Sequence, residues 1–284
     1  MGSEDVVRVT LPYQELYISK SVEKMKPYFK FVAFAAIFTL CTVLFAENPA
    51  WVLTVEGDYP FHLQGVDRNG ENEYFWSFTE YIVKTDSNGK VLLRKHLVSA
   101  PLHLGDLCSR NGYIYVTCTN IPDYSKDCRG STIRVYSQKD LSFVMEYPVS
   151  LKFGCDGICT TPEGFAVAIG CGSPNNNEVS QIFEYDGEFN LRKLHEFEHK
   201  PTYSAIQCLK RLPNGGYVAS LYGLLILLDG NFKVNERKSI DAGICISVEN
   251  ENTLLRAVHH RQHAQGWEVH LERVELADNT DRKK

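Results

Sequence analysis

One pattern recurs five times between residues 50 and 276 of this 284-residue chain, and it constrains the fold more than any other feature. Each copy begins with a short apolar segment, followed by a turn and a second strand dense in β-branched and aromatic residues. The opening segments are His62–Val66, His103–Leu107, Gly154–Ile158, Thr202–Ile206 and Ile240–Ile244. A period of about 40 to 50 residues with four short strands is typical of a propeller blade.

The two ends of this region complement each other. The fifth copy stops after its third strand, Glu268–Val274, whereas an unassigned strand, Trp51–Val55, precedes the first copy. Adding that strand to the fifth sheet would leave no open edges in the array. We therefore predict an all-β fold, a five-bladed β-propeller over residues 50–276 with blade five closed by the N-terminal strand. A β-sandwich of many short strands is the alternative.

Residues 31–46 form the only long uncharged apolar run. Lys20, Lys24, Lys26 and Lys30 precede it, an asymmetry that predicts an inside N-terminus and an exported body. Sixteen helical residues would span roughly 24 Å, which fits the h-region of a signal peptide better than a membrane span. The alternative is an uncleaved signal anchor that holds the propeller outside. Residues 1–30 are an N-terminal segment, of which 1–24 are an upstream extension if translation starts at Met25.

Charge narrows the range of partners. The chain has 30 basic and 35 acidic residues, and only Lys20 to Lys30 concentrates positive charge, which argues against nucleic-acid binding. We expect a monomer that is secreted or extracytoplasmic and binds a small molecule, glycan or peptide. Contact with a membrane is expected only through residues 31–46. Residues 277–284 are a polar tail.

Eight of the nine cysteines lie in the exported body, where disulfides are expected. Folding blade three about Glu163 places Cys155 opposite Cys171, and Cys118 and Cys128 flank a loop of blade two. These are two predicted disulfides. We expect the other four, Cys108, Cys159, Cys208 and Cys245, to be buried thiols that act as small apolar residues. A zinc site built from them is the alternative, although no Cys-x-x-Cys pair is present.

The innermost strands of a propeller line its central channel, so the polar residues near their starts are the candidate ligand site. These are His62, Gln64, His103, Asp106, Asp156 and Gln207. His62, His103 and Asp106 are the types of side chain that hold a divalent metal ion, which is the cofactor expected in the channel, or act as a base and its partner. Alternatively, the six residues simply hydrogen-bond water and backbone along the channel.

Two further groups are weaker candidates. His259, His260, His263 and His270 lie in or near a hairpin of blade five, where metal binding competes with simple exposure. Tyr59, Trp76, Phe78, Tyr81, Tyr124 and Tyr203 are candidates for a stacking rim, although we expect most to be core. No Gly-x-Ser-x-Gly, phosphate-loop or His-Glu-x-x-His motif is present.

Some blade openings resemble known propellers. Cys155-Asp-Gly-Ile158 followed by Thr-Thr-Pro-Glu-Gly, and Lys84-Thr-Asp86 with Gly89-Lys90, resemble repeats of NHL and gluconolactonase-like proteins at superfamily level. Phe61-His-Leu-Gln-Gly-Val66 and Phe153-Gly-Cys-Asp-Gly-Ile158 are similar to openings of the five-bladed glutaminyl cyclases. The Glu of the second cyclase motif is absent, so that activity is not carried over.

Two functions therefore remain open. The first is a non-catalytic propeller that binds a ligand at one channel mouth. The second is a metal-assisted or acid/base hydrolase, lactonase or cyclase at the same place. Fold alone does not decide between them.

Overall fold

The computed structural model describes residues 6–11, 14–19, 53–59, 62–70, 72–97, 102–120, 131–149, 151, 154–170, 177–263 and 266–276. The chain divides into two compact units, Met1–Ala50 and Trp51–Lys284. In the first unit, β1 (Val6–Leu11) and β2 (Gln14–Ser19) pair as an antiparallel hairpin. The predicted apolar segment 31–46 lies outside the described residues. No helix of the described part is long and apolar enough to cross a membrane.

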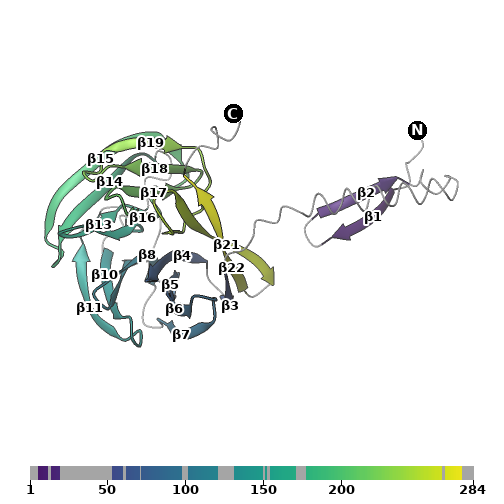
Figure 1. Cartoon of the computed structure of the whole chain (residues 1–284), viewed down its shortest axis with the longest axis horizontal. Helices are drawn as coiled ribbons and strands as arrows, with labels where there is room; N and C mark the ends of the chain where they lie inside the picture. The colour runs from purple at the N-terminus through teal and green to yellow at the C-terminus, as the bar shows by residue number, and fades with distance from the viewer. Residues whose placement is uncertain are drawn as a thin grey trace. The chain divides into compact units, whose positions relative to one another are not determined.

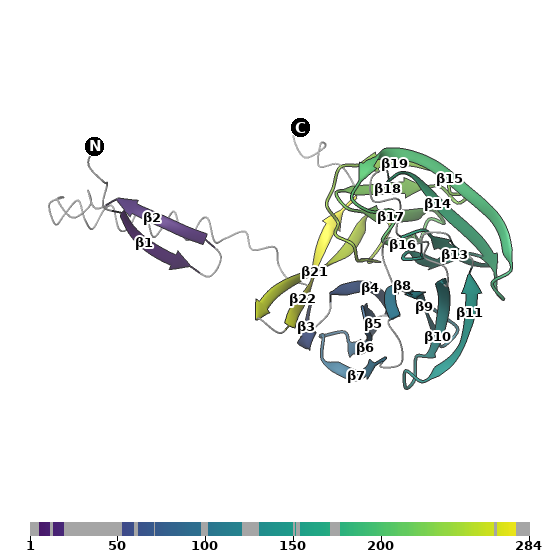
Figure 2. The same cartoon turned by 180° about the vertical axis from the view of Figure 1, so that it is seen from behind.

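The second unit consists of five four-stranded antiparallel sheets arranged around a centre (Figures 1 and 2). Blade one contains β4 (Leu63–Asn69), β5 (Glu73–Phe78), β6 (Tyr81–Asp86) and β7 (Val91–His96). Blade two contains β8 (Leu102–Arg110), β9 (Tyr113–Asn120), β10 (Ser131–Ser137) and β11 (Phe143–Val149). Blade three contains β12 (Ile158–Thr160), β13 (Gly164–Ala168), β14 (Asn177–Asp186) and β15 (Leu191–Thr202). Blade four contains β16 (Cys208–Arg211), β17 (Tyr217–Leu221), β18 (Leu224–Leu228) and β19 (Val234–Lys238).

Blade five closes the ring. It contains β20 (Ile246–Val248), β21 (Thr253–His263) and β22 (Gly266–Glu275), and its fourth strand is β3 (Leu53–Tyr59) from the start of the propeller. β3 is antiparallel to β22, with Thr54 opposite His270 and Val55 opposite Val269. This confirms the predicted five-bladed fold and the predicted closure of blade five by the N-terminal strand.

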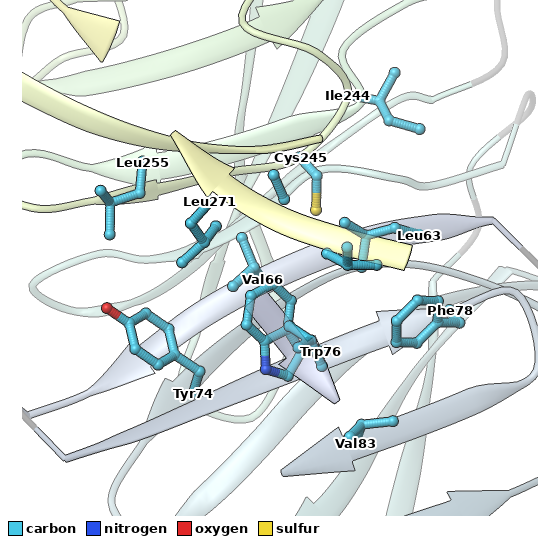
Figure 3. Close-up of a cluster of buried hydrophobic side chains, with 13 residues drawn as sticks. Leu63, Val66, Tyr74, Trp76, Phe78, Val83, Ile244, Cys245, Leu255 and Leu271 are labelled. Carbon is cyan, nitrogen blue, oxygen red and sulfur yellow. The ribbon is translucent and has the colours of Figure 1, made fainter. Parts of the chain in front are cut away.

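The core follows from this arrangement, because each sheet buries both faces against its neighbours. Five apolar clusters lie between successive blades, and one of them joins blade five to blade one. In that cluster, Trp76 and Phe78 of blade one pack with Cys245 and Leu271 of blade five (Figure 3). Trp76 and Phe78 are fully buried, so these two candidates for a stacking rim belong to the core.

Buried hydroxyl groups join the inner part of one blade to the next. Ser77 of β5 donates to the carbonyl of Gly105 at 2.6 Å, and Thr117 of β9 donates to the carbonyl of Asp156 at 2.7 Å. Ser220 of β17 likewise donates to the carbonyl of Gly243. The three hydroxyls occupy equivalent positions, which aligns Val66, Leu107 and Leu209 as the apolar residues of their inner strands.

This alignment corrects the predicted repeat in the later blades. In blades one to three the predicted opening segments overlap the inner strands, but in blades four and five the inner strands begin at Cys208 and Ile246, after the predicted segments end. Leu209, not Ile206, is therefore the blade-four equivalent of Leu107. Short apolar stretches on either side of the strand start look alike in sequence, and only the pairing with the second strand distinguishes them.

The structure does not support the predicted disulfides. Cys118 and Cys155 are buried free thiols, and their proposed partners Cys128 and Cys171 lie outside the described residues. The predicted register of blade three would place Ile158 opposite Ala168, whereas Ile158 pairs with Val167. The sulfur of Cys155 instead lies against blade two, 3.8 Å from the carbonyl oxygen of Cys118.

The remaining cysteines behave as predicted. Cys108, Cys159, Cys208 and Cys245 are buried free thiols, and each lies in a different apolar cluster between blades. Burial raises the pKa of Cys108, Cys208 and Cys245 well above its usual value, so these thiols remain protonated.

Candidate functional site

Two histidines and a glutamine meet at the channel mouth, where blades one and two begin. The amide nitrogen of Gln64 lies 3.0 Å from Nε2 of His103 and also contacts Nε2 of His62. The two imidazole rings are tilted, with their centroids 5.8 Å apart. The structure thus brings together three of the six predicted site residues, from β4 and β8 and the residue preceding β4.

Burial sets the charge of this cluster. It lowers the pKa of His62, and it lowers the pKa of His103 to about 4, with a smaller contribution from the charge on His62. Both rings are therefore largely uncharged at neutral pH. A neutral imidazole accepts a hydrogen bond on one nitrogen and donates from the other, so Gln64 can donate to both rings.

A second polar cluster lies at the mouth between blades three and four. The amide nitrogen of Gln207 donates to a carboxylate oxygen of Asp156 at 3.1 Å and to the carbonyl of Gly170 at 3.0 Å. Burial raises the pKa of Asp156 to about 7, while the hydrogen bond from Gln207 opposes the rise. A methyl group on Gly170 would lie 2.0 Å from the carboxyl group of Asp156, so glycine is required there. Asp156 is thus a firmly held carboxyl group.

Asp106 is not part of either cluster. It lies where the register of β8 shifts between Leu104 and Leu107. Its carboxylate forms an ion pair with Lys210, with Oδ1 and Nζ 2.6 Å apart. It also accepts from the backbone N–H groups of Ile158 and Leu209 at 3.3 and 3.1 Å. One carboxylate therefore joins blades two, three and four across the channel.

Lys210 was missed by the sequence analysis. Its side chain is only 4% exposed, and its ammonium group also donates to the carbonyl of Leu107 at 2.7 Å. Burial alone would lower the pKa of Lys210, but the charge of Asp106 and other groups raises it well above its usual value. Burial raises the pKa of Asp106 to about 6, with Lys210 opposing the rise, so both partners are charged at neutral pH.

The predicted metal set of His62, His103 and Asp106 is not assembled. Within the described parts of the chain, no group of three or more His, Cys, Asp or Glu side chains is arranged to hold a metal ion. The physical reason is the ion pair with Lys210, which uses the carboxylate that the prediction assigned to the metal. The described cysteines form no such group either, so the structure gives no support to a zinc site among them.

A pocket of about 400 Å³ opens beside His62, where blades four, five and one meet. Its lining residues are His62, Tyr222, Asp241, Gly243, Ile244, Arg256, Ala257 and Val258. Ile244 lies just before the inner strand of blade five. It occupies the position that Gln64 occupies in blade one and Gln207 in blade four. The pocket is therefore a continuation of the channel mouth, and it exists because blade five is packed against blade one.

Two tyrosines of blade four lie at this end of the propeller. Tyr222, in the turn between β17 and β18, lines the pocket and is 40% exposed. Tyr203, before β16, is 84% exposed and meets Tyr222 edge-on with centroids 5.4 Å apart. Tyr203 belongs to the predicted stacking rim, whereas Tyr222 does not.

None of the remaining candidates is among the described residues that line this pocket. Tyr81 stacks on His96 with centroids 4.3 Å apart, and nothing is described of the side chains of Tyr59 and Tyr124. His259, His260 and His263 lie near the end of β21, as the predicted hairpin requires, but their side chains are outside the description. His270 is buried in β22, where its Nδ1 lies 2.8 Å from the hydroxyl of Thr54.

Comparison with known proteins gives the fold and no more. No protein-family model matches the sequence, and no curated protein matches it. Similar solved structures include a protein of unknown function from Bacteroides caccae, with 12% identity over 76% of this chain and 78% of that chain and a TM-score of 0.49.

Two others have names that suggest an activity. A calcium-binding protein, regucalcin, from Agrobacterium tumefaciens has 14% identity, coverage of 76% and 78%, and a TM-score of 0.46. A putative gluconolactonase has 12% identity, coverage of 77% of both chains and a TM-score of 0.49. At these values the likeness is one of fold, and it says nothing of ligand or reaction.

Proposed function

We propose that this protein is a binding propeller that holds a small ligand in the pocket at its channel mouth. The supporting observation is the pocket itself, about 400 Å³ in volume and lined by His62, Tyr222, Asp241 and Arg256 from three blades. Ligand pockets are commonly concave, of this size, and lined by apolar and aromatic groups with a few polar side chains.

The channel-mouth residues favour binding over catalysis. His62 and His103 face a shared amide group, whereas the carboxylate of Asp106, which could orient a histidine, is committed to an ion pair with Lys210. A general base needs a partner that orients it, as well as access to the substrate. The two histidines and the amide that they share therefore support a role in holding a ligand.

Filling the pocket tests this proposal. Val258 lines the pocket and is partly exposed, so Val258→Trp places a large side chain there, whereas Val144→Trp puts the same change on the outer strand β11. We expect at least one member of a library of small molecules, glycans and peptides to bind the native protein and the Val144→Trp variant but not the Val258→Trp variant. Ligand-observed NMR is the measurement. If Val258→Trp retains every ligand that the native protein binds, the pocket is not the binding site.

An acid/base enzyme is the second candidate, and Asp156 is the observation that favours it. A buried carboxyl group with a pKa raised to about 7 is suited to exchange protons near neutral pH. Under this alternative, Asp156→Asn abolishes hydrolysis of a sugar lactone while ligand binding persists. Equal rates for the native protein and this variant would eliminate Asp156 as the catalytic group.

We also propose that the propeller is exported, on the basis of residues 31–46 and the lysines before them. Cleavage predicts a mature protein that begins near Glu47. N-terminal sequencing of the protein from its native host tests this, and an intact N-terminus in the membrane fraction would favour the anchor instead.

A further inference from the structure

The charges around the mouth pocket do not balance. Among the described residues that line it, Asp241 and Arg256 are the two with ionisable acidic or basic side chains other than histidine. Arg256 is committed elsewhere, because its Nε and Nη2 both lie 2.6 Å from the carboxylate of Glu272 and its Nη1 donates to the backbone carbonyl of Asp241 at 2.5 Å. Glu272 is buried and cancels the positive charge. Among the described lining residues, this leaves one charge without a charged partner, the carboxylate of Asp241.

The backbone holds that carboxylate in place. Asp241 is exposed, and its Oδ1 accepts a hydrogen bond from the N–H of Gly243 at 3.1 Å. Gly243 has a φ of +71°, which disfavours residues with a side chain, and its carbonyl accepts the hydrogen bond from Ser220. The second carboxylate oxygen remains available for a ligand, because a carboxylate accepts several hydrogen bonds.

The rest of the pocket is aromatic and uncharged. Tyr222 supplies an aromatic ring, Tyr203 lies edge-on beside it, and burial keeps the pKa of His62 low. A tyrosine face attracts a cation through its quadrupole, and a fixed carboxylate nearby adds to that attraction. An anionic ligand would meet the charge of Asp241, and the one described cation of the lining, Arg256, is already paired with Glu272.

We propose that the mouth pocket selects ligands that carry an organic ammonium group, a primary or quaternary amine. This inference rests on the proposed function, since it names the class of ligand that the same pocket takes. Asp241 pairs with the ammonium group, and the ring of Tyr222 contacts its alkyl and cationic surface. Uncharged glycans and acidic ligands bind less well because they forgo one or both contacts.

Isothermal titration with choline, n-butylammonium and the neutral choline isostere 3,3-dimethyl-1-butanol tests the proposal. Tyr222→Ala should weaken binding of both ammonium probes by about 3- to 30-fold, the range expected for a cation near an aromatic face. Asp241→Asn keeps an acceptor for the N–H of Gly243 and should weaken binding by about 2- to 5-fold, with less loss at high salt.

Matched variants outside the pocket serve as controls. Tyr113 is also 40% exposed, and Asp140 accepts the N–H of Ser142 much as Asp241 accepts that of Gly243. Tyr113→Ala and Asp140→Asn should leave choline binding unchanged. Circular dichroism of all four variants establishes that each retains the native fold.

The possible outcomes distinguish an error in the ligand class from an error in the location of the binding site. The ammonium proposal is wrong if the neutral isostere binds as tightly as choline, or if neither ammonium probe binds. In either case the proposed function is still supported by any library ligand whose binding Val258→Trp abolishes. If choline binds but neither Tyr222→Ala nor Asp241→Asn weakens it, the ammonium site is elsewhere and the proposal is again wrong. If Val258→Trp removes no ligand of any class, the proposed function itself fails.

Discussion

Gln64, Asp156 and Gln207 occupy the same position in three different blades, just before the apolar residue that aligns the inner strands. Each is almost fully buried, and each makes hydrogen bonds at the channel mouth. In blade five the position is held by Ile244, which lines the pocket instead. The repeat thus places polar groups around most of the mouth and an apolar wall on the pocket side.

Asp156 should make stability depend on pH. Its pKa is raised from 3.8 to about 7 in the folded protein, so the folded state binds the proton more tightly than the unfolded state. The resulting stabilisation is present at low pH and is lost as pH rises between about 4 and 7. Asp156→Asn should therefore flatten this part of the curve, with the largest relative gain in stability near pH 8.

Urea unfolding of the native protein and of Asp156→Asn at pH 5 and pH 8 measures this difference. An equal change in unfolding free energy between the two pH values in both proteins would show that Asp156 keeps an ordinary pKa. Asp140→Asn, at an exposed turn, is the control.

At the level of single residues, the sequence predicted part of the candidate site. His62, Gln64 and His103 were found because they begin inner strands, which is a property of the repeat. Lys210 was missed because the predicted alignment of blade four was displaced by three residues, from Leu209 to Ile206. Tyr222, Asp241 and Arg256 come from different turns and strands, and only the packing of blades four, five and one brings them together.

Among the elements, the inner strands are held together by a buried charged group and its partners. The carboxylate of Asp106 joins β8 to β16 through Lys210, and it accepts the backbone N–H at the start of β12. A buried charge without a partner is costly, so each partner depends on the other. These contacts tie the inner strands of blades two, three and four together across the channel.

Removing Lys210 should therefore destabilise the propeller strongly. Lys210→Met leaves the carboxylate of Asp106 buried and unpaired, which should lower the free energy of unfolding by about 3 to 5 kcal/mol. Adding Asp106→Asn should restore part of that loss, since the second change removes the unpaired charge. Urea unfolding at pH 7.5 measures both.

Lys193→Met, at an exposed position of β15, is the matched control and should change stability by less than about 0.5 kcal/mol. A loss for Lys210→Met no larger than that of this control would show that the buried ion pair does not form.

The number and type of strands were predictable, whereas several of their boundaries were not. Alternating apolar residues and Gly- or Asn-containing turns specify a hairpin in each blade. Register is decided by contacts across strands, which is why the proposed pairing of Cys155 with Cys171 was off by one residue. The sulfur of Cys155 lies against blade two instead.

For the whole propeller, closure of the ring is the feature on which the other conclusions depend. β3 completes blade five, and the cluster around Trp76 joins that blade to blade one (Figure 3). The mouth pocket is lined from both of these blades and from blade four, so an open array of sheets would not form it. The sequence predicted this closure because a strand at the start of the domain matched a missing strand at its end.

An engineered disulfide between β3 and β22 tests ring closure most directly. Thr54 and His270 face each other across the two strands, at a separation that suits a disulfide, whereas Glu275 pairs with Thr253 at the other end of β22. The account predicts that Thr54→Cys with His270→Cys forms a cross-link, identified by mass spectrometry of peptides, and that Thr54→Cys with Glu275→Cys does not. Absence of the first cross-link in a folded protein, or formation of both, would contradict a ring closed by β3.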